Sequence, residues 1–121
     1  MAEKQFRFQD LEIWQRGAAL SGPLFVLADR LDEQKRYRFA EQLRGATLSI
    51  TNNIAEGSGS TSDADFAAFL NFSRRSVFEV ANILLVLSRE QALQSVDVGE
   101  LLRALEEQSR MTLAFIRHLR S

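Results

Sequence analysis

Helical periodicity along nearly the whole chain is the feature that most limits what this sequence can fold into. Apolar residues recur every three or four positions in four long segments, which are separated by short polar breaks. No run alternates as a half-buried strand would, and the one proline, Pro23, should kink or split the first helix. Because the breaks are short, neighbouring helices are expected to be antiparallel. The sequence therefore predicts an all-α fold, an antiparallel up-down-up-down four-helix bundle, in one domain spanning residues 1–121.

Local capping signals predict where the four helices begin and end. The first helix is expected from Asp10, a candidate N-cap, to about residue 31, and the second from about residue 35 to about residue 56. Gly57 would end the second helix as its C′ residue. Ser62, with Asp65 three positions later, has the pattern of a capping box before a third helix that runs to about residue 90. The fourth helix is expected from Asp97 almost to the C-terminus.

Composition excludes several classes of function. The chain has no cysteine, which excludes disulfides, thiolate catalysis and cysteine-bound zinc. Basic and acidic side chains number 15 and 16, so no global attraction to nucleic acid is expected. The N-terminal stretch lacks the apolar core of a signal peptide, and no stretch is apolar enough to span a membrane. A cytoplasmic protein without membrane contact is the expectation.

The first and third expected helices carry apolar residues on two sides, whereas a helix of a four-helix bundle buries one broad stripe. A wide core with scattered exposed apolar side chains is one explanation, because such side chains are common on protein surfaces. Self-association through these two helices is the explanation that we favour. The candidate interface residues are Ile13, Leu20, Leu24, Leu27, Leu31, Phe72, Phe78 and Ile83.

The stretch "SITNNIAEGSGS", residues 49–60, places polar side chains near the apolar face of the second helix. Asn53 falls on that face, where an amide must be hydrogen-bonded or cost a few kcal/mol. The third helix offers partners, and a shared polar cluster would fix the register of the two helices. The candidate cluster is Ser49, Asn53, Glu56, Ser73, Ser76 and Glu79.

Other uses of this region are weaker predictions. Glu56 and Glu79 could act as paired carboxylates, but no histidine, cysteine or lysine stands near them in the sequence. The glycines lack the phosphate-loop pattern and no strand precedes them, although "GSGSTS" before a helix could bind an anion weakly. No Glu-x-x-His motif is present. The expectation is no catalytic residue, no metal and no cofactor.

Two runs, "EQLRGATLSITNNIAEGSGS" and "DFAAFLNFSRRSVFEVANIL", resemble the family of four-helix-bundle proteins, or 23S rRNA intervening-sequence proteins. The chain departs from the family pattern at Gly45, where a basic residue is common, and at Ser73, where alanine is usual. The matching positions are Leu11, Trp14, Gln42, Arg44, Ala46, Ser49, Ile50, Asn53, Ile54, Ala55, Glu56, Gly57, Phe66, Phe69, Leu70, Ser76 and Glu79.

The resemblance implies a four-helix protomer that assembles into a homopentameric ring. Some members of the family are encoded within insertions in large-subunit ribosomal RNA genes. A related basic protein is the accessory subunit of diversity-generating retroelements, which works with a reverse transcriptase and nucleic acid. The family has no established enzymatic activity, so the resemblance implies a non-enzymatic protein.

Two functions remain open. The first is association of the oligomer with RNA or DNA through arginines, which bind phosphate well but form ion pairs equally well. The alternative is a scaffold for protein–protein contacts that does not bind nucleic acid. A continuous positive face would favour the first function, and a mixed or apolar face the second. The candidate nucleic-acid-binding residues are Arg36, Arg38, Arg44, Arg74 and Arg75.

Overall fold

The computed structural model describes residues 3, 5–93 and 98–121, and these contain helices but no strand. The all-α prediction is confirmed for this part of the chain, and the four α-helices pack together as a bundle. The elements are a 3-10 helix η1 (Arg7–Asp10) and the α-helices α1 (Glu12–Glu33), α2 (Tyr37–Ser58), α3 (Asp63–Arg89) and α4 (Val98–Arg120).

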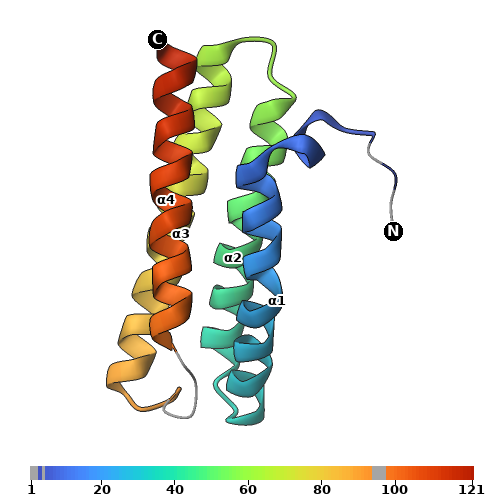
Figure 1. Ribbon diagram of the computed structural model, residues 1–121. Coiled ribbons are helices and arrows are strands. Elements are labelled where there is room, and N and C mark those ends of the chain that lie inside the picture. Colours follow the sequence, from blue (N-terminus) through green and yellow to red (C-terminus); the bar gives the residue numbers. More distant parts are fainter. Residues whose placement is uncertain (1–2, 4, 94–97) are drawn as a thin grey trace.

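The helices are not packed equally closely around the bundle. Figure 1 shows α1 lying against α2 and α4 lying against α3, while the 3-10 helix η1 lies beside the start of α1 and the end of α2. Contacts are extensive between α1 and α2, between α2 and α3, and between α3 and α4. The packing of α1 against α4 is much sparser, so the bundle has one loosely packed seam.

The start of α3 follows the predicted capping signal, whereas the end of α2 does not. Ser62 is the N-cap of α3, and its Oγ accepts a hydrogen bond from the Asp65 amide at 3.1 Å. The prediction that Gly57 ends α2 is wrong, because α2 continues to Ser58 and Gly59 is its C-cap. Helix α1 begins after Asp10, which closes the 3-10 helix η1 instead of capping α1.

Gly57 is buried inside α2 for a packing reason. A Cβ atom at this position would lie 2.7 Å from the Phe69 Cβ and 2.9 Å from the Phe66 Cδ1. Such distances are too short for carbon atoms, so glycine permits the close approach of α2 and α3 at this point. The expected N-cap of α4, Asp97, lies outside the described residues.

The core occupies the space between the four helices and takes one stripe from each. It includes five α1 residues that the sequence analysis placed at a subunit interface, each with at most 7% of its surface exposed: Ile13, Leu20, Leu24, Leu27 and Leu31. That part of the interface prediction is wrong. These side chains pack against the chain's own core and are unavailable to a second copy.

Pro23 does not split the first helix, because α1 runs without interruption from Glu12 to Glu33. Its side chain is exposed on the α1–α4 side of the bundle, where it lines a groove. Since proline has no amide hydrogen, the Ala19 carbonyl lacks the helical donor it would otherwise have at position 23. Among the described residues, no helix is long and apolar enough to cross a membrane.

Candidate functional site

A chain of hydrogen bonds joins α2 to α3 on the outer side of the bundle. The Asn53 Nδ2 donates to the Ser49 carbonyl at 2.9 Å and to the Ser49 Oγ at 3.0 Å. The Ser49 Oγ lies 2.8 Å from the Ser76 Oγ, which donates to the Phe72 carbonyl at 3.2 Å. Because Ser76 uses its hydrogen in that bond, Ser49 is the donor to Ser76. Each hydroxyl therefore donates once, Ser49 to Ser76 and Ser76 to the Phe72 carbonyl.

The network forms the wall of an open groove of about 390 Å³ between α2 and α3. The Asn53 Nδ2 donates to two acceptors of Ser49, and no hydrogen bond within the described residues reaches the Asn53 Oδ1. The groove thus offers acceptors from Asn53 and Glu79, donors from Arg75, and the exposed ring of Phe72. A polar groove with an aromatic edge can bind a planar or peptide-like group. Its lining is Ser49, Asn53, Phe72, Arg75, Ser76 and Glu79.

The structure brings together part of the predicted polar cluster and separates the rest. Ser73 lies in the core, where its Oγ donates to the Ile50 carbonyl at 2.7 Å and ties α3 to α2 separately. Glu56 is exposed and lines a different hollow, beside Arg7 of η1. Glu56 and Glu79 therefore do not face each other as a carboxylate pair. Within the described residues, no group of three or more potential metal ligands is gathered.

Arg44 forms ion pairs with two aspartates of α1. Its Nη2 lies 2.6 Å from the Asp32 Oδ2 and 2.7 Å from the Asp29 Oδ1. The hydrogen bond with Asp32, followed by that with Asp29, raises the pKa of Arg44 above its ordinary value. Arg44 therefore ties α2 to α1, and its guanidinium is already engaged by carboxylates.

The other four candidate arginines have different surroundings. Arg36 is half-buried at the N-cap position of α2, and Arg38 is exposed two residues later. Arg74 lies over the Phe78 ring, 5.2 Å from its centroid. Arg75 is exposed and lies 5.9 Å from the centroid of the Phe72 ring. The structure thus places only Arg75 in the polar groove.

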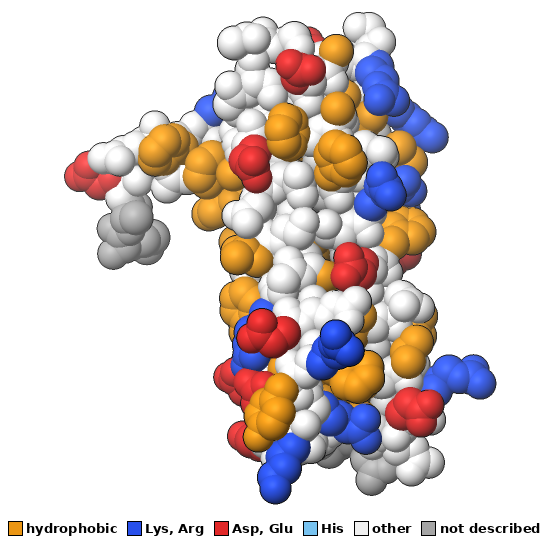
Figure 2. All heavy atoms as spheres, turned by 180° about the vertical axis from the view of Figure 1, so that it is seen from behind, with side chains coloured by type: hydrophobic (Ala, Val, Ile, Leu, Met, Phe, Trp, Pro, Cys, Tyr) orange, Lys and Arg blue, Asp and Glu red, His pale blue; other side chains and the backbone are white. Residues whose placement is uncertain are grey.

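Large hydrophobic side chains remain exposed over the outer surface of the bundle. Phe72 and Phe78, two of the predicted interface residues, are 51% and 58% exposed, and Ile83 is half-buried. Figure 2 shows the bundle from behind, where basic and acidic side chains are interspersed with hydrophobic ones and no single sign of charge dominates. The other exposed large hydrophobic residues are Phe6, Val26, Tyr37, Phe39, Leu48, Leu85 and Val86.

The sequence analysis missed Gln108, a fully buried polar residue of α4 at the loosely packed seam. Its Nε2 donates to the Ile13 carbonyl at 2.8 Å, and its Oε1 has no hydrogen-bond partner within the described residues. The signal was present, because residue 108 continues the helical spacing of Leu101, Leu105 and Thr112. A glutamine in an apolar stripe indicates a buried amide that needs a partner.

A comparison with protein families finds a match that covers most of the chain. Residues 9–114 match the family described as 23S rRNA-intervening sequence protein. The matched region includes all of α1, α2 and α3 and most of α4, and therefore the whole polar groove. No curated protein matches the chain.

Proposed function

The chain belongs to the 23S rRNA-intervening sequence protein family, and from this premise we propose that it is a non-enzymatic, self-associating scaffold for protein contacts. The observation that carries the proposal is the set of large hydrophobic side chains exposed on the bundle, above all Phe72, Phe78 and Leu85 on α3. Fully burying one such side chain contributes about 1.5–3 kcal/mol. A contiguous exposed apolar patch rimmed by polar groups marks a protein-binding site, and Phe78 and Leu85 lie two helical turns apart on the same side of α3.

A homopentamer is the assembly that the family resemblance implies, and we propose it for this chain. In this assembly each protomer is an antiparallel up-down-up-down bundle. Contacts between the end of one helix and the start of the next support that topology, such as Gly57 of α2 with Phe66 of α3. The separation of Glu56 from Glu79 supports a non-enzymatic role, since these were the candidate acid–base pair.

RNA association is the second candidate, and one local arrangement favours it. Phe72 and Arg75 form an exposed aromatic–guanidinium pair at the edge of the polar groove. Single-stranded RNA is often bound by stacking a base on an aromatic ring, while an arginine contacts phosphate. The near balance of 15 basic and 16 acidic side chains, which are interspersed on the face shown in Figure 2, argues against a broad electrostatic footprint. RNA contact would therefore be confined to this groove and repeated by each subunit.

Native mass spectrometry of protein purified at low salt, before and after nuclease treatment, tests the proposed function. The expected result is a pentamer, the assembly that the family resemblance implies. An oligomer free of nucleic acid supports the scaffold, and nuclease-sensitive added mass supports RNA association. A monomer at micromolar concentration would contradict self-association and would leave the exposed side chains without the role proposed for them.

The second candidate predicts a specific loss of RNA affinity. Phe72→Ala should weaken binding of a single-stranded RNA oligonucleotide about tenfold, because base stacking on an aromatic side chain is worth about 1–3 kcal/mol. Arg75→Ala should weaken it as well and flatten the salt dependence. Arg44→Ala is the matched control, because Asp29 and Asp32 already engage that guanidinium. Fluorescence anisotropy at two salt concentrations measures these effects, and equal losses in all three variants would argue against the groove.

A further inference from the structure

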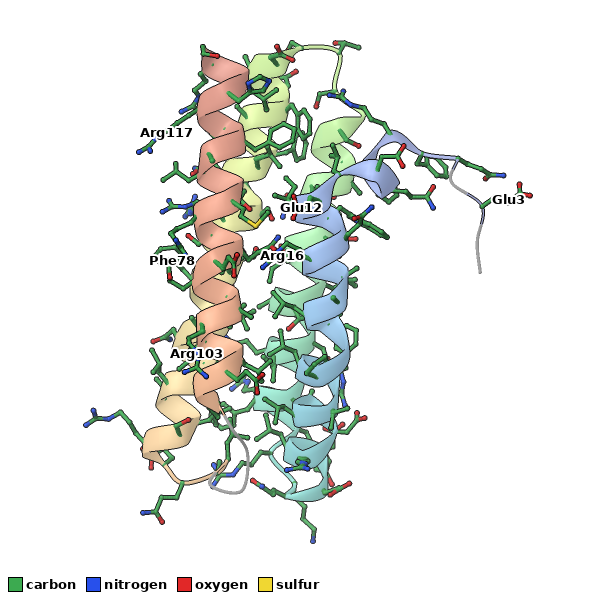
Figure 3. All side chains as sticks on the ribbon, in the orientation of Figure 1. Glu3, Glu12, Arg16, Phe78, Arg103 and Arg117 are labelled. Carbon is green, nitrogen blue, oxygen red and sulfur yellow. The ribbon has the colours of Figure 1, made fainter. Side chains whose placement is uncertain are left out.

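The loosely packed seam between α1 and α4 contains a second groove, the α1–α4 groove. Its volume of about 650 Å³ lies within the range of about 300–1,000 Å³ that is usual for small-molecule sites. Figure 3 shows Arg16 reaching into the space between the two helices, and Arg16 and Gln108 line the end of the groove that we call inner. The apolar walls are Ala19, Leu20 and Pro23 of α1 and Leu101 and Ala104 of α4.

The inner end of the groove holds a hydrogen-bond acceptor that has no donor. Gln108 is fully buried, and its Nε2 donates to the Ile13 carbonyl at 2.8 Å. Because a carbonyl can bond only the NH₂ end of an amide, this contact fixes which end of the side chain is the oxygen. The Gln108 Oε1 is covered from solvent and has no partner within the described residues. A buried acceptor in this state costs stability until a donor reaches it.

The charged side chains around the groove are already engaged. The Arg16 Nη2 lies 3.0 Å from the Glu107 Oε2, and the Arg16 Nη1 lies 3.9 Å from the Glu12 Oε1. Glu100, which also lines the groove, has an interaction of its own. A charged group beside the buried Gln108 amide would therefore lack a free counter-ion, and burying an unpaired charge is unfavourable. These contacts select a neutral donor.

The groove is elongated, and its acceptor lies at one end. On α1 its lining runs from Arg16 to Pro23, which spans about 10 Å at the helical rise of about 1.5 Å per residue. Gln108 contacts the Ile13 carbonyl, so it lies at the Arg16 end and away from Pro23. The packing of α1 against α4 is sparse, so a small separation of these helices would open the path to the Gln108 Oε1.

We propose that the α1–α4 groove binds a neutral, elongated, apolar molecule that carries one O–H or N–H group at its end. That group donates to the Gln108 Oε1, and the apolar body lies between Leu20 and Ala104 and extends towards Pro23. Burial of the apolar body supplies the affinity, while the hydrogen bond sets the orientation and disfavours molecules without a donor. This site is distinct from the polar groove between α2 and α3, and the inference does not rest on the proposed self-association.

Three related probes test the chemistry of the site by isothermal titration calorimetry. n-Octanol has a neutral hydroxyl at the end of an apolar chain. Heptyl methyl ether is its isomer, with the same atoms and an oxygen near one end but no donor. Octanoate carries a charge at that end. Octanol should bind saturably, and the ether should bind about tenfold more weakly, because it leaves the Gln108 acceptor unpaired. Octanoate should bind more weakly than octanol as well.

Three variants test the location of the site. Gln108→Met keeps a side chain of similar length without the acceptor, so it should bind octanol and the ether equally. Ala19→Trp fills the groove from an exposed position of its wall and should abolish binding of both. Ala114→Trp is the matched control, because Ala114 is exposed on α4 and does not line the groove. It should bind as the wild type does.

Several outcomes would overturn the inference. One is a wild-type protein that shows no saturable binding of octanol up to the solubility limit, and another is equal affinity for octanol and the ether. A preference for octanol that persists in Gln108→Met would place the hydrogen bond elsewhere, and binding retained by Ala19→Trp would place the ligand elsewhere. If circular dichroism shows that Gln108→Met does not fold, the wild-type comparison of the probes and the Ala19→Trp result decide.

Discussion

Replacing Phe66 with alanine is expected to lower the free energy of unfolding by about 3–5 kcal/mol, the range for truncating a buried aromatic residue. Phe66 is 2% exposed and belongs to the first turn of α3. Its ring lies 5.4 Å from that of Phe115 on α4 and beneath the Arg7 guanidinium of η1, at 5.1 Å. It also packs where α2 passes closest, at Gly57. One side chain therefore joins four elements at one end of the bundle.

Urea denaturation followed by circular dichroism measures the effect of Phe66→Ala. Phe72→Ala is the matched control, since this phenylalanine of the same helix is 51% exposed. Its removal should change stability by less than about 1 kcal/mol, as is usual for surface positions. Because self-association adds to apparent stability, both variants must be compared at the same protein concentration. Equal losses at the two positions would contradict the packing described for this end of the bundle.

The class of fold could be predicted because its signals are local in the sequence. Four long segments with helical spacing, separated by short breaks, leave few alternatives to a helical bundle. The Ser62–Asp65 pattern marked the start of α3 correctly, because an N-cap depends only on residues within one turn. Helical spacing and capping patterns depend on nearby residues alone, so the packing of the helices does not alter what they predict.

The predictions that failed needed information about distant parts of the chain. Glycine is common after the last turn of a helix, so Gly57 looked like a helix end. Its actual role depends on Phe66 and Phe69, which approach only once α2 and α3 have packed. Likewise, helical spacing showed that α1 has two apolar sides but could not show which side faces the core. Leu24 and Leu27 proved to be core residues, while Trp14 and Phe25 on the other apolar side are half-buried.

The sequence predicted that polar residues of α2 and α3 would meet at the candidate site, but it did not predict which of the polar residues would be left out. The need of Asn53 for a partner pointed to a polar contact between α2 and α3, and the Ser49–Ser76 contact supplies that connection. Whether Glu56 belongs to the same site depends on where the last turn of α2 points. It points to η1, a short element whose position the periodicity of the helices cannot predict. Arg44 could equally have bound phosphate, and only the packed structure places Asp29 and Asp32 against it.

Gly57→Ala is expected to destabilise the protein by about 1–3 kcal/mol, the cost of forcing extra volume into a packed interior. Alanine is otherwise the better helix former, by about 1 kcal/mol, so the clash must exceed that gain. The added Cβ would meet the Phe69 Cβ at 2.7 Å, and neither atom can move without shifting a helix. Gly45→Ala, in the same helix, is the control, because a Cβ there meets nothing within 4 Å. It should stabilise the protein by about 0.5–1 kcal/mol.

A double-mutant cycle then identifies the source of the cost of Gly57→Ala. In a Phe66→Ala background the contact with the Phe66 Cδ1, at 2.9 Å, is gone, so Gly57→Ala should cost less there by about 1 kcal/mol. The contact with the Phe69 Cβ remains, so the cost should not vanish. Gly45→Ala should show no such coupling, since it lies outside this contact. If Gly57→Ala and Gly45→Ala stabilised the protein equally, α2 and α3 would not approach as closely as the structure places them.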